Sequence, residues 1–121
     1  MLALLAGAAG CGGGDNGASA QTQAEQVAAG QDVYAAECAQ CHGEQGEGGT
    51  GPVLIGGSRR IASYENTDRL YDYVSRTMPF DDAGSLSEDE YWASIAFLLQ
   101  ENELLPADVV LGPDTDLTLE R

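Results

Sequence analysis

The chain has 121 residues, with 20 acidic and 5 basic side chains and a formal net charge of −15. This excess of negative charge argues against nucleic acid as a partner, because binding to phosphates needs the opposite sign. The length allows one small domain, and we expect part of the chain to lie outside it.

The N-terminal residues 1–10 form an apolar stretch that is too short to span a bilayer as a helix, and we interpret it as a signal peptide. Small residues precede Cys11 in a pattern that resembles the signal of bacterial lipoproteins, in which the cysteine is lipid-modified. No lysine or arginine precedes the apolar run, so an ordinary signal peptide cleaved nearby is the alternative. Both interpretations predict export, with residues 11–23 as a flexible tether.

Residues 24–105 are assigned to the folded domain, and its first helix is expected to begin after Thr22. Thr22 and Glu25 have the spacing of a capping box, and apolar residues recur at helical spacing as far as Cys38. Gly30 lies within this helix, where glycine is about 1 kcal/mol less favourable than alanine. We infer that another helix approaches closely at Gly30.

The next feature is a Cys38-x-x-Cys41-His42 motif, the pattern of covalent c-type haem attachment. Two thiols on one helical turn can each add to a haem vinyl group, and the adjacent imidazole can bind the iron. A zinc site would lack a fourth ligand, because the remaining cysteine is the distant Cys11 and there is no second histidine. A thioredoxin-like pair would need a βαβ context, and a structural disulfide would leave His42 without a role.

Two further helices are expected. The second begins near Asn66 and ends before Pro79, because proline disfavours helical conformation at the preceding residue. The third begins at a capping box of Ser87 and Glu90 and carries an apolar stripe over residues 91–99.

The third helix is expected to pack against the first, with Gly30 and Tyr34 meeting the apolar stripe near Ile95 and Phe97. The fold class is therefore all-α. The remaining residues, 106–121, lack helical periodicity, and we expect an extended, loosely held acidic tail. As alternatives, Val109, Val110 and Leu111 could pin it against the domain, or it could bind a partner.

Taken in order, these features resemble the class I cytochromes c over residues 26–100. The shared elements are Gly30-x-x-x-Tyr34, the C-x-x-C-H motif, a glycine-rich loop over residues 43–49, Gly51-Pro52-Val53-Leu54, Met78-Pro79 and a closing helix with Ile95-Ala96-Phe97-Leu98. The resemblance implies a small cytochrome c fold, in which three main helices pack around one covalently bound haem c.

The resemblance also implies the roles of the residues that hold the haem. Cys38 and Cys41 would form thioether bonds to it, and His42 would be the proximal iron ligand. The carbonyl of Pro52 would accept the other ring N–H of His42, which fixes the tautomer of the imidazole.

Met78 would supply the distal ligand, through its thioether sulfur. The other methionine, Met1, belongs to the leader. Pro79 favours an extended conformation at Met78, which turns the side chain out of the helical register and toward the iron.

Arg59, Arg60 and Tyr64 lie in a segment that could cover the haem propionates, where a guanidinium would pair with a carboxylate. Solvated arginines are the alternative. Three further aromatic residues are expected to pack in the core or against the haem: Tyr71, Tyr73 and Trp92.

With both axial ligands bound, the iron would have no open position, and one-electron transfer would remain as its chemistry. The expected function is an electron carrier rather than an enzyme, at the outer face of the cytoplasmic membrane or in the periplasm, anchored by a lipid on Cys11. Its partners would be redox proteins. The acidic surface either steers the protein to a basic docking surface or serves solubility alone.

Three alternatives remain open. The protein could be a fixed haem c subunit of a larger redox complex, docked through residues 106–121 and the apolar face of the last helix. It could be a haem enzyme or gas sensor in which Met78 is displaceable. It could also be a thiol oxidoreductase that uses Cys38 and Cys41.

Overall fold

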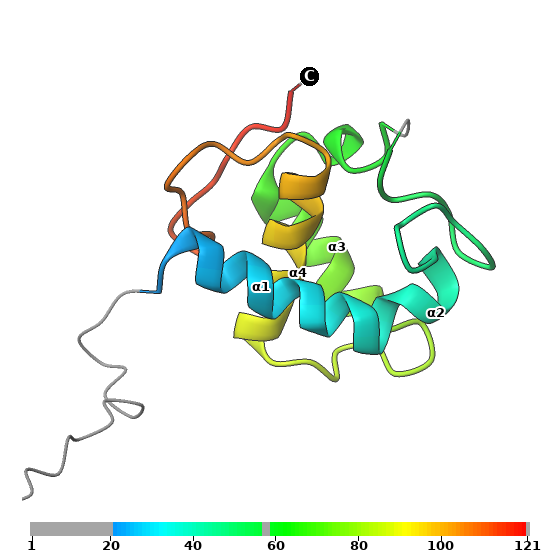
Figure 1. The fold of residues 1–121 in the computed structure, drawn as a ribbon. Coiled ribbons are helices and arrows are strands. Elements are labelled where there is room, and N and C mark those ends of the chain that lie inside the picture. Colours follow the sequence, from blue (N-terminus) through cyan, green and yellow to red (C-terminus); the bar gives the residue numbers. More distant parts are fainter. Residues whose placement is uncertain (1–20, 57–58, 121) are drawn as a thin grey trace, which may run out of the picture.

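A computed structural model describes residues 21–56 and 59–120, which form an all-helical domain (Figure 1). One isolated antiparallel bridge joins Asn66 and Thr118. The helical elements are α1 (Gln23–Val33), a π-helical turn (Tyr34–Cys38), α2 (Ala39–His42), a 3-10 turn (Ala62–Tyr64), α3 (Thr67–Thr77) and α4 (Glu88–Glu101). Cys11 and the signal peptide assigned to residues 1–10 lie outside the described residues, so they remain predictions. No helix within the described ranges is long and apolar enough to cross a membrane.

Both predicted capping boxes are present and set the starts of α1 and α4. At α1 the amide of Glu25 donates to Thr22 Oγ1 over 3.1 Å, and the amide of Thr22 donates to Glu25 Oε1 over 2.8 Å. At α4 the same reciprocal pair forms between Ser87 and Glu90, over 3.1 and 2.9 Å. Each box satisfies two amides that have no partner within the helix.

The close contact between α1 and α4 occurs at Gly30, as expected (Figure 1). A Cβ atom placed on Gly30 would lie 1.8 Å from the carbonyl oxygen of Ala93. One turn further along, the ring of Tyr34 packs against that of Phe97 with centroids 5.4 Å apart. Glycine at residue 30 therefore brings the backbones of the two helices together.

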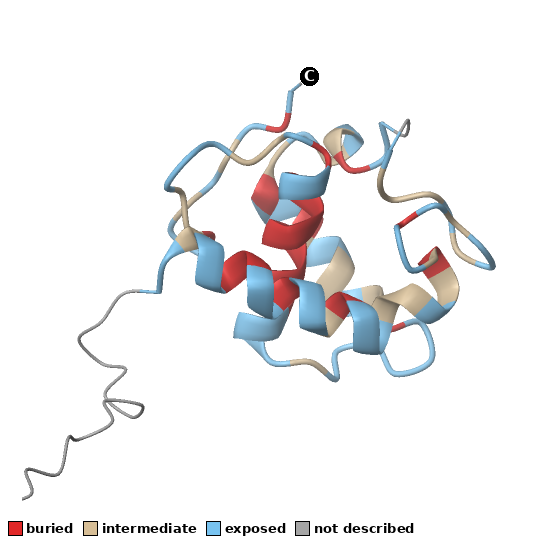
Figure 2. Cartoon of the chain, in the orientation of Figure 1, coloured by how far each residue is buried: buried red, intermediate tan, exposed pale blue. Residues whose placement is uncertain are grey.

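Helix α4 forms the centre of the core, because every residue from Tyr91 to Leu99 is buried (Figure 2). The expected packing of its apolar face against the first helix is confirmed. The alternative in which this face docks a fixed subunit onto a larger complex is wrong, because α1 and the rest of the domain already cover it.

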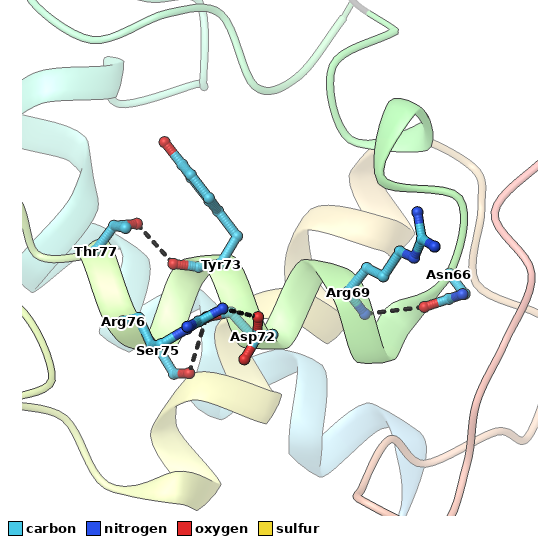
Figure 3. Close-up of polar contacts among 7 residues, drawn as sticks. All are labelled: Asn66, Arg69, Asp72, Tyr73, Ser75, Arg76 and Thr77. Atoms are coloured by element: carbon cyan, nitrogen blue, oxygen red, sulfur yellow. Dashed lines mark hydrogen bonds and ion pairs between the residues drawn. The ribbon is translucent and has the colours of Figure 1, made fainter.

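Helix α3 is capped and held by polar contacts at both ends (Figure 3). The side chain of Asn66 accepts a hydrogen bond from the amide of Arg69 at 2.9 Å, and Arg76 pairs with Asp72 one turn earlier. Near the last turn, Thr77 Oγ1 donates to the carbonyl of Tyr73 at 2.6 Å. The helix ends at Thr77, before Pro79, as predicted.

The tail after residue 105 is extended, but the expectation that it is loosely held is wrong. The side-chain amide of Gln26 donates to the carbonyl of Leu111 at 2.9 Å and accepts from its amide at 2.8 Å. Further along, the amide of Leu119 donates to the carbonyl of Glu65 at 2.7 Å. Leu111 and Leu119 are both 4% exposed, so the tail closes the core against α1 and the start of α3.

We predict that Gly30→Ala destabilises the protein, although alanine favours a helix over glycine by about 1 kcal/mol. The added methyl group would overlap the carbonyl of Ala93, and overpacking of this kind typically reduces the free energy of unfolding by roughly 1–3 kcal/mol. Urea unfolding of the two proteins measures the difference. The matched control is Gly112→Ala, because a Cβ there meets nothing within 4 Å. A gain in stability for Gly30→Ala would contradict the close crossing.

Candidate functional site

The C-x-x-C-H motif begins in the π-helical turn and ends at the last residue of α2. We expected a regular helix as far as Cys38, but the amide of Ala39 donates to the carbonyl of Tyr34, five residues earlier. The chain then turns sharply at Gly43, whose φ of 89° is a conformation that favours glycine. The motif therefore begins at the end of the π-helical turn and is followed directly by Gly43.

His42 is 7% exposed, and its ring is oriented by the loop that follows. Its Nδ1 lies 2.8 Å from the carbonyl oxygen of Pro52, so the expected contact between these two residues is present. Because a carbonyl only accepts hydrogen bonds, Nδ1 must carry the proton and donate. The neutral ring then has its lone pair on Nε2, the form in which histidine binds a metal.

The loop between Gly43 and Ile55 is held against the motif by backbone hydrogen bonds. The amide of Gly48 donates to the carbonyl of His42, and the amide of Gly51 donates to that of Cys41, both over 2.7 Å. A Cβ on Gly51 would lie 2.8 Å from Cε1 of His42. Glycine is thus needed at residue 51 for the loop to lie directly against the imidazole ring.

The two motif cysteines are half-buried and have free thiols. Burial raises the pKa of the Cys38 thiol to about 11, and the nearby charges of Glu37 and Cys41 add to this shift. Before haem is attached, the thiol is therefore protonated at neutral pH. A thiol oxidoreductase needs a thiolate with a lowered pKa, so the environment of Cys38 disfavours that alternative.

Tyr34 links the start of the motif to its end. Its side chain is 2% exposed, and its hydroxyl donates to the carbonyl of Gly43 at 2.7 Å. Burial raises the pKa of Tyr34 to about 12, with smaller contributions from Cys38 and Glu47. The hydroxyl therefore stays protonated as a donor throughout the neutral range.

Met78 lies on a different segment, immediately after α3. Its backbone is extended, with φ −121° and ψ 151°, as the following proline favours, and its side chain is half-buried. The amide of Met78 makes the last hydrogen bond of α3, to the carbonyl of Val74 at 2.9 Å. Its own carbonyl accepts a hydrogen bond from the hydroxyl of Tyr91 at 2.6 Å.

The contact between Tyr91 and Met78 was missed from the sequence, which suggested only a packing role for this tyrosine at the start of the last helix. The two residues are 13 positions apart and are joined by an irregular segment. No local pattern gives the distance between such residues.

The residues proposed to lie near the propionates are on the surface. Arg59 and Arg60 are exposed, and Tyr64 is half-buried with its ring 5.2 Å from that of Tyr73. Tyr73 is itself 43% exposed, so it is not a core residue. Two other aromatic rings do pack inside the domain, stacked with centroids 4.2 Å apart: Tyr71 and Trp92.

The donor set of the motif fits covalent haem attachment. Two unpaired thiols are available for thioether bonds, and the adjacent imidazole has its proton fixed on Nδ1 by Pro52. Within residues 21–56 and 59–120, no group of three or more histidine, cysteine and acidic side chains lies close enough to hold a metal ion.

The helical fold and this motif define a class I c-type cytochrome. The chain belongs to the family described as cytochrome c oxidase, cbb3-type, subunit III, which matches residues 25–98. The protein therefore carries covalently bound haem c with its iron, and its role is in electron transfer.

One solved structure gives a second comparison. The chain is similar to a chain of the sulfane dehydrogenase SoxCD from Paracoccus pantotrophus, with 43% sequence identity and a TM-score of 0.59. The similarity covers 70% of this chain and 47% of that chain, so this protein spans about half of the length of its SoxCD counterpart. A comparison with curated protein sequences finds no match.

We predict that Gly51→Ala weakens the hold of the loop on His42. The new methyl group would lie 2.9 Å from Nδ1 and would push the loop away from the ring. The free energy of unfolding should fall by roughly 1–3 kcal/mol, and the Nδ1 proton should exchange faster with solvent in NMR spectra. Gly112→Ala again serves as the control. An unchanged exchange rate in Gly51→Ala would contradict the role assigned to this glycine.

Proposed function

We propose that the protein is a one-electron carrier in which Cys38 and Cys41 bind haem c through thioether bonds. In this proposal His42 Nε2 and the sulfur of Met78 would bind the haem iron. The observation that carries it is the hydrogen bond from His42 Nδ1 to the carbonyl of Pro52, which leaves Nε2 as the ligating nitrogen. This bond also orients the ring and strengthens the nitrogen as a ligand.

The choice of Met78 is supported by its backbone and by composition. Its extended conformation ends the helical register, and the half-buried side chain is the only thioether apart from that of Met1. Haem iron, when bound, supplies a change between ferric and ferrous states, and a thioether ligand favours the ferrous state. We therefore expect a positive reduction potential.

The surface around Phe80 supports a redox protein as the partner. Phe80 is 84% exposed, the most exposed large hydrophobic side chain among the described residues, and it follows Met78 and Pro79 directly. Asp81 and Asp82 beside it are also exposed. We infer a partner whose docking surface combines an apolar centre with basic residues at its rim.

Part of the acidic excess has a local structural role and does not bear on partners. Glu88, Asp89 and Glu90 form the first turn of α4, where negative charge interacts favourably with the helix dipole. Steering toward a partner is therefore assigned to the acidic residues next to Phe80 rather than to the net charge as a whole.

Localisation follows from the family and from the N-terminal pattern. Members of this family carry covalent haem c, which indicates an exported protein. We propose that residues 1–10 are the signal peptide and that a lipid on Cys11 holds the protein at the outer face of the cytoplasmic membrane. The tether expected over residues 11–23 ends before Thr22, because Thr22 caps α1 and Gln23 begins it.

A second candidate is a fixed haem c subunit of a larger redox complex. The similarity to a chain of SoxCD favours it, because that chain is part of a sulfane dehydrogenase. The two candidates differ in the lifetime of the contact with the partner. Co-purification with an enzyme at high salt supports the fixed subunit, whereas a freely diffusing monomer supports the carrier.

We predict that Met78→Ala leaves haem attached but removes the distal ligand. The reduction potential should fall by an amount on the order of 0.1 V, within the range of about 0.8 V that axial ligands span. The oxidised variant should lose the far-red sulfur-to-iron absorption band and should bind carbon monoxide rapidly when reduced. An unchanged spectrum and potential would contradict the assignment of Met78. Rapid carbon monoxide binding by the unaltered protein would favour the gas-sensor alternative.

We predict that Cys11→Ala releases the protein from the membrane without changing its absorption spectrum or potential. The substitution removes the sulfur that would carry the lipid and leaves the haem-binding residues intact. Membrane fractionation, with mass spectrometry of the intact protein, measures the outcome. Retention of Cys11→Ala in the membrane, or an unacylated mature chain that begins elsewhere, would contradict the lipid anchor.

A further inference from the structure

The carbonyl of Met78 is held by a residue from another helix. Tyr91 lies in the first turns of α4 and is 3% exposed, and its hydroxyl donates to the Met78 carbonyl over 2.6 Å. The only other contact of this carbonyl that the described residues show is with the amide of Gly84, at a long 3.4 Å. Tyr91 therefore provides the principal partner of this acceptor.

Tyr91 is itself fixed in place from several directions. Its amide donates to the carbonyl of Ser87 at 3.0 Å, within the capping box that starts α4. Its ring meets that of Tyr71 edge-on, with centroids 6.1 Å apart and an interplanar angle of 82°. Its hydroxyl oxygen also accepts a hydrogen bond from the amide of Leu86 at 3.4 Å. A hydroxyl held in this way can fix the position of the Met78 carbonyl that it binds.

The amide of Met78 is bonded to Val74 at the end of α3, so the backbone of this residue is held on both sides. The two hydrogen bonds restrain the point from which the side chain extends. Pre-fixing the backbone lowers the entropy that is lost when the sulfur binds, because fewer conformations remain to be excluded.

We propose that Tyr91 is a positioning residue for Met78, whose hydroxyl controls how firmly the distal sulfur stays on the iron. The proposal rests on the function proposed above, in which Met78 is that ligand. It separates two properties of the protein. Cys38, Cys41 and His42 determine whether haem is attached, and Tyr91 determines how easily another ligand replaces Met78.

The test is the affinity of the oxidised holoprotein for imidazole, which binds the iron only where the methionine has left it. In Tyr91→Phe the ring remains and the hydrogen bond is lost, so the state with sulfur bound becomes less favourable. The loss of one hydrogen bond to this half-buried carbonyl should raise the apparent imidazole affinity roughly tenfold. The far-red sulfur-to-iron band should also disappear at a lower temperature, while haem stays attached.

Tyr34→Phe is the matched control. It removes a buried tyrosine hydroxyl that donates to a loop carbonyl at 2.7 Å, but on the His42 side of the site. We expect a comparable loss of overall stability and an imidazole affinity within twofold of that of the unaltered protein. Equal increases in both variants would show that Tyr91 acts only through general stability, and would overturn the proposal.

A double-mutant cycle with Met78→Ala separates positioning from packing. Once the methionine side chain is gone, Tyr91→Phe should change the imidazole affinity by less than twofold. An undiminished tenfold effect in that background would overturn the proposal.

If Tyr91→Phe does not accumulate, para-aminophenylalanine and para-methylphenylalanine in place of Tyr91 compare side chains with and without a hydrogen-bond donor. The amino variant should then bind imidazole about tenfold more weakly than the methyl variant, and equal affinities would overturn the proposal.

Failure of the proposed function gives a different result. If Met78 is not the ligand, the unaltered oxidised protein lacks the far-red band and Met78→Ala leaves imidazole binding unchanged. If Met78 is the ligand and Tyr91 does not position it, the band is present and Tyr91→Phe binds imidazole as the unaltered protein does.

Discussion

The close crossing of α1 and α4 at Gly30 is the constraint on which both halves of the site depend. Glycine allows the Ala93 carbonyl to lie where a methyl group would otherwise be, and this fixes the two helices relative to each other. One buried tyrosine comes from the π-helical turn that continues α1, and one comes from α4. Tyr34 holds the carbonyl of Gly43 beside the C-x-x-C-H motif, and Tyr91 holds that of Met78. Two short hydrogen bonds thus connect one helix pair to both of the segments proposed to bind the iron.

Much of this arrangement could be predicted from the sequence, because it depends on residue type and on local spacing. The capping boxes require a hydroxyl and a carboxylate three residues apart, and both are found where expected. Gly30 was informative because glycine is unfavourable within a helix unless something approaches closely. The contact between His42 and Pro52 was expected from the resemblance to cytochromes c, and it is present at 2.8 Å.

The features that could not be predicted depend on residues far apart in the sequence. The π-helical turn before Cys41, the contact of Tyr91 with Met78 and the attachment of the tail have no local signature. The tail was expected to be loose because it lacks periodicity, and pinning through apolar residues such as Leu111 was only an alternative. Leu111 is buried and paired with Gln26, a partner that no local pattern indicates. The apolar surface of α4 was expected to pack against the first helix, and docking of a partner stayed open as an alternative, because hydrophobicity alone does not distinguish an internal contact from an external one.

The pairing of Gln26 with Leu111 links residues 85 positions apart, and it satisfies a buried amide by a side chain rather than by a regular helix or sheet. That amide is shielded from water only while α1 and the final segment are both in place. Its rate of hydrogen–deuterium exchange therefore reports the integrity of the whole domain rather than the fraying of one helix. Exchange at the Leu111 amide would therefore show when the final segment separates from α1.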